Sequence, residues 1–291
     1  MYMHFEDVKG LLSPKGNMNI YRGCTHGCIY CDSRSLCYNI NHPFEDIMVK
    51  RNAPQLLETA LKGKRRKMMI GTGSMSDPYM HCEQQLQYTR KCLEIADKYG
   101  FGFTLITKSD LVLRDTDLLQ SINSKTKAVV QMTLTTVDEK LCRILEPDVA
   151  TTQQRFAALM ELKKAGIPTV VWLTPILPFI NDTEENIRSI LQMCVDAGVK
   201  GVICFDMGLT LREGNREYFY AQLDKHFPGM KERYISHFGD SYICTSPNNP
   251  QLMALFRKIC HENGIMYDND KIFEYLRTFE DKGGGEQLTL F

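Results

Sequence analysis

Short apolar runs alternate with longer amphipathic segments along most of this chain. The apolar runs predict strands at residues 18–21, 68–71, 102–107, 128–133, 169–174 and 201–206. The amphipathic segments predict helices at 54–62, 82–99, 115–121, 153–164 and 183–197. Strands that alternate with helices in this way predict an α/β fold with a parallel sheet and right-handed crossovers.

The pattern changes after residue 206, where only helical segments are predicted, at 215–226, 230–238, 251–262 and 271–280. We therefore expect an N-terminal arm at 1–16, a barrel-like α/β unit at 17–206 and a mainly helical extension at 207–282. Residues 283–291 begin with three glycines and are expected to form a flexible tail.

Composition is that of an ordinary globular enzyme, with 291 residues, 43% hydrophobic residues and a formal net charge of zero. Zero net charge gives no general attraction to nucleic acid. The longest apolar stretch, 169–180, contains two prolines and is too short to span a membrane, so no membrane partner is expected. Eleven cysteines without a charged-then-apolar leader predict a reducing compartment and a cytoplasmic location.

Three of these cysteines, Cys24, Cys28 and Cys31, have the spacing C-x3-C-x2-C. Three thiolates can hold three corners of a four-iron four-sulfur cluster and leave the fourth iron open for another ligand. Gly23 and Gly27 let the backbone approach such a cluster and direct N–H groups at its sulfurs. Chemistry at an open iron is therefore the favoured interpretation.

The cysteine triplet has two other possible uses. A structural zinc site usually pairs one C-x2-C with a second Cys or His pair, and the other eight cysteines lack grouped spacing. A disulfide framework is not expected in a long chain without a secretory leader.

With Tyr30 immediately before the last cysteine, the triplet resembles the C-x3-C-x-aromatic-C signature of the radical S-adenosylmethionine superfamily. The resemblance implies a 4Fe–4S cluster whose fourth iron binds the methionine part of S-adenosylmethionine, while Tyr30 lies against the adenine. It also implies a partial (β/α)6 barrel, here with a C-terminal helical extension. An electron donor such as flavodoxin or ferredoxin is the partner that this chemistry requires.

Active sites of parallel barrels lie where strands end, and this rule selects the other candidate cofactor-binding residues. The second predicted strand leads into Gly71, Gly73, Ser74, Ser76 and Asp77, a region that in the family binds the amino group of the cofactor. Lys108 follows the third strand and could neutralise the methionine carboxylate, or could be a solvated loop lysine. Thr133 ends the fourth and could contact ribose or carboxylate, or could merely suit a strand.

A closer resemblance is to the spore photoproduct lyase-like branch of the superfamily, whose members are often labelled DNA repair photolyases. The matching stretches are Ser76-Asp77-Pro78-Tyr79, Ile106-Thr107-Lys108-Ser109, and Leu145-Glu146-Pro147 followed by Arg155. This resemblance implies a DNA lesion as a possible substrate.

One position departs from that branch. Spore photoproduct lyase returns a hydrogen atom from a cysteine just before the Ser-Asp pair, and the matching position here is Ser74. Cys82 lies on the same connection and is the candidate catalytic substitute, although a half-buried structural cysteine is the favoured interpretation of this position.

The last residues, Gln287, Leu288, Thr289, Leu290 and Phe291, resemble the peptide that attaches bacterial polymerases and repair proteins to the DNA sliding clamp. A tail that folds back onto the barrel as a strand is the alternative.

The sequence thus predicts a radical S-adenosylmethionine enzyme that forms a 5′-deoxyadenosyl radical and abstracts hydrogen, from a DNA lesion in a repair context. The alternatives are a radical enzyme acting on a protein or small metabolite, and a clamp-associated metal-binding adaptor without catalysis.

Overall fold

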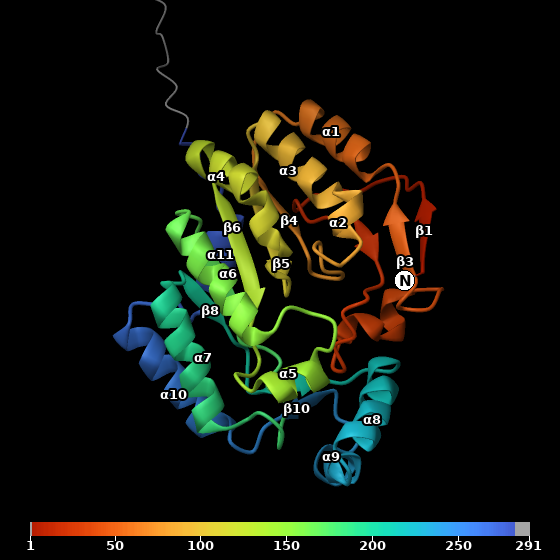
Figure 1. Ribbon diagram of the computed structural model, residues 1–291, viewed down its shortest axis with the longest axis vertical. Coiled ribbons are helices and arrows are strands. Elements are labelled where there is room, and N and C mark those ends of the chain that lie inside the picture. Colours follow the sequence, from red (N-terminus) through yellow and green to blue (C-terminus); the bar gives the residue numbers. More distant parts are fainter. Residues whose placement is uncertain (1, 283–291) are drawn as a thin grey trace, which may run out of the picture.

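The computed structural model describes residues 2–282. At its centre is a parallel sheet with the strand order β4 (Met69–Thr72), β5 (Gly102–Thr107), β6 (Ala128–Thr133), β7 (Thr169–Trp172) and β8 (Gly201–Ile203). One face is covered by α1 (Ala53–Gly63), α3 (Tyr88–Lys98), α4 (Thr116–Lys125), α6 (Thr152–Lys164), α7 (Glu184–Ala197) and α10 (Asn249–Glu262) (Figure 1). The predicted α/β partial barrel is confirmed.

The sequence of each strand separates the two faces of the sheet, because successive side chains point to opposite sides. On β6, Val130 and Met132 belong to the main core under the outer helices. Val129, just before them, packs on the opposite side, and Gln131, which lies between them, lines a cavity there. The inner face therefore carries the positions that can build a site.

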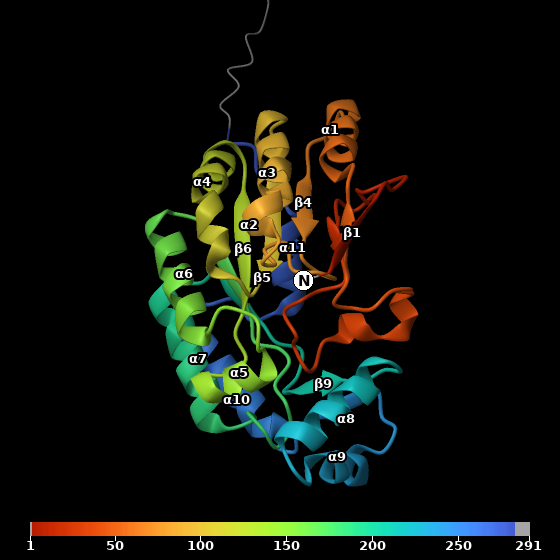
Figure 2. The same ribbon diagram turned by 45° about the vertical axis from the view of Figure 1, so that its right-hand side comes forward.

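The first predicted strand is much shorter than expected. Asn17 forms a single parallel bridge with Gly71, and the Met18 N–H donates to the Gly71 carbonyl over 2.8 Å. The chain then leaves the sheet, because β2 (Tyr21–Arg22) pairs antiparallel with β3 (Ile47–Lys50). β3 is parallel to β1 (Met3–Glu6), so the predicted N-terminal arm contains a strand of this small second sheet (Figure 2).

The long helix predicted at 82–99 is divided by Gln87, whose φ of 54° ends one helix and precedes the next. The two pieces are α2 (Glu83–Leu86) and α3. Helix α5 (Glu139–Leu145) was not predicted, and the Asp138 carboxylate caps it by accepting from the N–H groups of Lys140 and Leu141. Short 3₁₀ helices are η1 (Asp32–Arg34), η2 (Leu36–Tyr38) and η3 (Asp110–Asp115).

The C-terminal extension combines helices α8 (Asn215–His226), α9 (Met230–Phe238) and α11 (Asn269–Arg277) with a small antiparallel sheet of β9 (Gly208–Thr210) and β10 (Ile243–Thr245). Helix α11 lies against the inner face of the main sheet, where Ile272 and Leu276 pack with Val129, Val170 and Ile203. The extension therefore closes part of the open side of the barrel.

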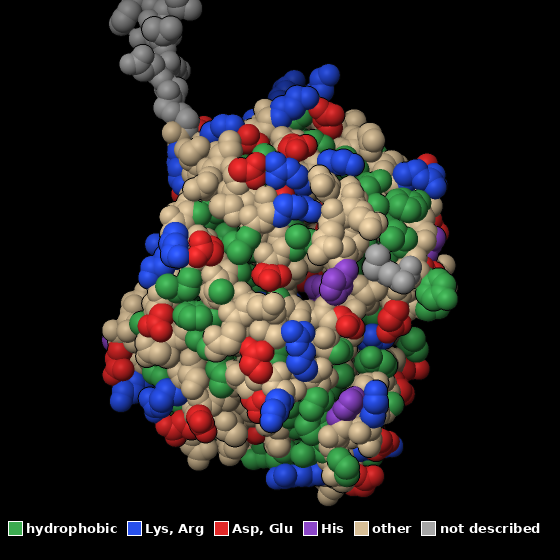
Figure 3. Space-filling view, in the orientation of Figure 1, with side chains coloured by type: hydrophobic (Ala, Val, Ile, Leu, Met, Phe, Trp, Pro, Cys, Tyr) green, Lys and Arg blue, Asp and Glu red, His purple; other side chains and the backbone are tan. Residues whose placement is uncertain are grey.

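Acidic and basic side chains are interspersed over the face shown in Figure 3, as expected from a net charge of zero. Within residues 2–282, none of the helices combines the length and the apolar character that crossing a membrane requires.

Candidate active site

Two adjoining cavities lie at the carboxyl ends of the parallel strands, where the predicted site was expected. Cys24, Cys28 and Cys31 line a cavity of about 110 Å³, here called the cluster cavity. It adjoins a larger cavity of about 540 Å³, here called the upper chamber. The two share a common wall of residues from the cysteine loop and the strand ends: Tyr30, Cys31, Ser33, Gly73, Ser74, Met75, Ile106, Lys108 and Thr133.

The cysteine loop is held in place by backbone hydrogen bonds to distant segments. The Cys24 N–H donates to the carbonyl of Phe44 over 2.9 Å, and the Ile29 N–H donates to that of Leu145 over 3.0 Å. Gly23 has a φ of 85°, and a Cβ on it would lie 2.5 Å from the Phe44 oxygen. No other residue fits this position, so the glycine next to the first cysteine is required for close approach.

The sulfur donors match what a 4Fe–4S cluster needs. Cys24 and Cys28 are buried and Cys31 is half-buried. Burial raises the pKa of the Cys24 thiol to about 12 and raises that of Cys28 well above its usual value, so cluster binding must displace these protons. Within residues 2–282, no three His, Cys, Asp or Glu side chains converge on a position for a single metal ion.

Lys108 places a positive charge beside these sulfurs. Burial alone would lower its pKa, but electrostatic attraction to Cys28 and Glu146 outweighs burial and raises it. Its Nζ lies 5.8 Å from the centre of the Tyr30 ring, and both residues line the upper chamber. The geometry fits a role for Lys108 in neutralising an anionic group of a ligand. The ring of Tyr30 beside it offers an aromatic surface of about the size of adenine.

Asp77 lines the cluster cavity, but its carboxylate oxygens already accept hydrogen bonds from other groups of the protein. They accept from the Thr107 hydroxyl over 2.7 Å, from the Lys108 N–H over 2.7 Å and from the Tyr79 N–H over 2.8 Å. The buried ring of His26 lies 3.4 Å away. Burial lowers the pKa of His26, although Asp77 acts in the opposite direction. Asp77 therefore joins the ends of β4 and β5 and orients a histidine that the sequence did not single out.

Behind Tyr30 lies a buried charged pair. The Tyr30 hydroxyl donates to Glu146, and Arg155 forms an ion pair with the same carboxylate. A second nitrogen of Arg155 donates to the Thr133 carbonyl over 2.7 Å, which links the pair to the wall of the site. The sequence motif contained Glu146 and Arg155, but no role was predicted for them.

The upper chamber also contains residues that were not predicted. Trp172 and Phe205 line it, and their rings lie 6.3 Å apart. Both occupy inner-face positions, Trp172 alternating with Val171 and Phe205 with Cys204, whose side chains belong to the outer core. Counting every second residue toward the end of each strand would have identified them.

The structure does not bring two of the predicted residues to these cavities. Gly71 faces Asn17, and a Cβ on it would lie 2.9 Å from the Asn17 oxygen. It lines a separate cavity on the inner face. Cys82 is 2% exposed within the main core, and burial raises its thiol pKa to about 12. A thiol buried there is not placed to donate hydrogen in the upper chamber. Cys82 instead packs in the core as a small apolar side chain.

Comparison with known families identifies the chain. The model of the radical SAM superfamily matches residues 18–194, and the chain belongs to that superfamily. Enzymes of this superfamily use a 4Fe–4S cluster and S-adenosylmethionine in radical chemistry, and these are the cofactors of this chain.

Relatives are found in bacteria, archaea and viruses. An uncharacterized protein of Mycobacterium tuberculosis is 29% identical over 223 residues, which are 75% of this chain and 65% of that protein. An uncharacterized protein of Methanocaldococcus jannaschii is 34% identical over 169 residues, 57% of this chain and 62% of that protein. A radical SAM Nα-GlyT isomerase of Pseudomonas phage M6 is 21% identical over 266 residues, 87% of this chain and 52% of that protein.

Among solved structures, spore photoproduct lyase complexed with dinucleoside spore photoproduct has a TM-score of 0.65 and 14% identity, covering 91% of this chain and 81% of that chain. A mutant lyase with bound AdoMet and the same dinucleoside has a TM-score of 0.64, covering 91% and 78%. At this identity the likeness shows the fold.

Proposed function

We propose that this enzyme abstracts a hydrogen atom from a DNA lesion held in the upper chamber. When bound, the reduced cluster supplies the electron that cleaves S-adenosylmethionine to the 5′-deoxyadenosyl radical. The residues Cys24, Cys28 and Cys31 would hold the cluster. Tyr30, Lys108 and Thr133 would hold the cofactor between the cluster cavity and the upper chamber.

The observation that carries the proposal is the shared wall of the two cavities. The same side chains of Tyr30 and Lys108 face both the three cysteines and the upper chamber. A cofactor seated on this wall would reach the cysteine side with one end and the chamber with the other. Trp172 and Phe205 give the chamber an aromatic surface that suits a planar base.

The comparisons support a nucleoside as the group in the chamber. Lyase structures of the same fold contain a dinucleoside photoproduct. Reversal by a cysteine hydrogen donor is not part of the proposal, because among the described residues Cys31 alone brings a thiol to the upper chamber and it belongs to the cluster triplet. Ser74 stands at the wall instead.

The test uses anaerobically reconstituted enzyme, S-adenosylmethionine, dithionite and DNA oligonucleotides with deuterium-labelled thymine. We expect labelled 5′-deoxyadenosine with ultraviolet-damaged DNA and none with undamaged DNA of the same sequence. Equal labelling from both, or unlabelled 5′-deoxyadenosine from both, contradicts the lesion as substrate and favours a protein or small metabolite.

We also propose that the tail brings the enzyme to DNA through the sliding clamp. The predicted motif, residues 287–291, lies outside the described residues. Pull-down of the clamp with the full chain and with a chain ending at residue 285 tests it, and equal capture by both contradicts it. A flavodoxin or ferredoxin is the proposed electron donor, and replacing dithionite with either one in the labelling assay is its test.

A further inference from the structure

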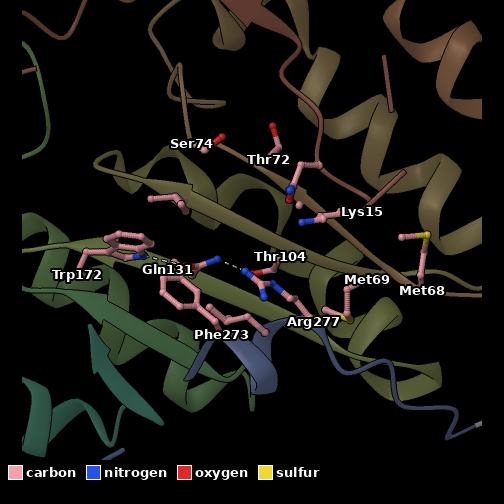
Figure 4. Close-up of a pocket in the computed structure, with 14 residues that line it drawn as sticks. Lys15, Met68, Met69, Thr72, Ser74, Thr104, Gln131, Trp172, Phe273 and Arg277 are labelled. Carbon is pink, nitrogen blue, oxygen red and sulfur yellow. Dashed lines mark hydrogen bonds between the residues drawn. The ribbon is translucent and has the colours of Figure 1, made fainter. Parts of the chain in front are cut away.

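A third cavity, of about 250 Å³, lies on the inner face of the barrel, on the side of α11 and the N-terminal arm. We call it the lower chamber (Figure 4). It shares Ser74, Ile106 and Trp172 with the upper chamber, so the two are adjacent along the inner face of the sheet. Nothing in the radical reaction proposed above uses its other residues.

The floor of the lower chamber carries a chain of hydrogen-bonded side chains. The Trp172 Nε1–H donates to Gln131 Oε1 over 2.8 Å, and Gln131 Nε2 donates to the Thr104 hydroxyl over 2.8 Å. Thr104 in turn donates to the Val129 carbonyl over 3.0 Å. These bonds fix the orientation of the Gln131 amide, and its second N–H is left to donate to a ligand.

Two cations stand at the mouth of this chamber. Lys15 and Arg277 reach into it from the arm and from α11, on opposite sides in Figure 4. Both are exposed, and neither forms an ion pair with a carboxylate among residues 2–282. Because both positive charges line the same chamber, an anion bound between them is attracted by both.

The segments that carry these cations are held firmly. Gly16, next to Lys15, has a φ of 84° and a Cβ on it would lie 2.4 Å from the Met69 carbonyl oxygen, so the arm lies directly on β4. The buried Lys127 Nζ donates to the Tyr275 carbonyl over 2.7 Å at the end of α11. The backbone positions from which the two cations extend are therefore held in place before a ligand binds.

We propose that the lower chamber binds a phosphate monoester, with Lys15 and Arg277 on the phosphate and the body of the ligand against Phe273 and Trp172. A dianion matches two cations, and the guanidinium of arginine can donate two parallel hydrogen bonds to phosphate oxygens. The phosphate source is either a nucleotide or a phosphorylated small metabolite. If this ligand extends into the upper chamber as the substrate, that part of the proposal rests on the function proposed above. Binding of the ligand in the lower chamber does not depend on that function.

The test is calorimetric titration of the full cluster-loaded chain without reductant, using thymidine 5′-monophosphate, ribose 5-phosphate, thymidine and citrate. We expect at least one phosphate to bind about tenfold or more tightly than thymidine and citrate. Whichever of thymidine 5′-monophosphate and ribose 5-phosphate binds more tightly shows whether the phosphate source is a nucleotide or a phosphorylated small metabolite. Trp172, the single tryptophan of the chain, reports where the ligand lies through its fluorescence, excited beyond the absorption of the nucleotide.

The double variant Lys15→Gln/Arg277→Gln should weaken phosphate binding by about tenfold or more and remove the fluorescence change. Lys225→Gln/Arg257→Gln, two exposed cations on α8 and α10, is the matched control and should bind as wild type. Equal binding by the two double variants, or binding of thymidine or citrate as tight as the phosphates, overturns the proposal. Because no S-adenosylmethionine is cleaved in this assay, failure here leaves the radical reaction untouched.

Discussion

The phenol of Tyr30, one residue before the last cysteine of the triplet, donates a hydrogen bond to Glu146, 116 residues further along the chain. Burial alone would raise the pKa of Glu146, but Arg155 and Lys108 outweigh it and hold the pKa below its usual value. The carboxylate is thus kept charged behind the cysteine loop. Its hydrogen bond fixes the ring that faces the cofactor wall.

Removing the charge of Glu146 should destabilise the fold. Glu146→Gln leaves the Arg155 guanidinium buried without a counter-charge, which costs about 3–5 kcal/mol. Urea unfolding of the cluster-free chain measures the loss. Glu184→Gln, which breaks the exposed pair with Arg188, is the control and should leave stability nearly unchanged. Equal effects of the two substitutions contradict a buried pair.

The Tyr30 ring and its hydroxyl should have separable effects. Tyr30→Phe removes the bond to Glu146 and should lower the free energy of unfolding by about 1–3 kcal/mol, because it leaves a buried carboxylate one partner short. It should change S-adenosylmethionine affinity little, whereas Tyr30→Ala should weaken that affinity by about tenfold. Calorimetric titration of reconstituted enzyme measures both. Equal affinity of both variants for S-adenosylmethionine would show that Tyr30 does not contact the cofactor.

Glu83 gives stability a predictable dependence on pH. Burial raises its pKa above 4.5, although Tyr21, Thr89 and Arg114 all act to lower it. The folded chain therefore binds the proton more tightly than the unfolded chain, and this contribution to stability is lost as pH rises through the raised pKa. In urea unfolding from pH 4.5 upward, wild type should lose stability more steeply than Glu83→Gln. Parallel curves would mean that the carboxyl has an ordinary pKa.

The thiol of Cys82 should be dispensable for the reaction. Cys82→Ala and Cys194→Ala each remove a buried sulfur from the main core and should each destabilise by about 1–2 kcal/mol. Neither should change the amount of final DNA product formed per 5′-deoxyadenosine, because a donor returns hydrogen to the substrate radical only after 5′-deoxyadenosine has formed. A loss of this product with Cys82→Ala but not with Cys194→Ala would show that Cys82 is a hydrogen donor.

Much of the barrel followed from strand alternation and helix periodicity, because β5, β6 and the helices behind them bury one continuous face. The cysteine triplet could also be recognised from the sequence, since three ligands and two glycines lie within one short loop. The first strand could not be predicted in the same way. Its apolar residues fit a strand, but whether they pair with β4 or with β3 depends on where the chain turns.

Other parts of the site depend on contacts between distant segments. Glu146 and Arg155 are read from sequence as an acidic and a basic residue near a helix, and only the fold shows both buried behind Tyr30. Lys15 precedes the barrel and Arg277 follows it, so their meeting at one cavity required α11 to lie across the inner face. Cys82 precedes α2 and packs in the main core, not in the site.

The measurement that tests the central claim most directly is the amount of 5′-deoxyadenosine formed by the anaerobically reconstituted chain with S-adenosylmethionine and dithionite. We predict about four iron and four sulfide per chain and product formation in wild type, with both lost in a Cys24→Ala, Cys28→Ala, Cys31→Ala triple variant. Tetrahedral zinc in place of iron and sulfide, or an intact cluster that forms no 5′-deoxyadenosine, would contradict the account.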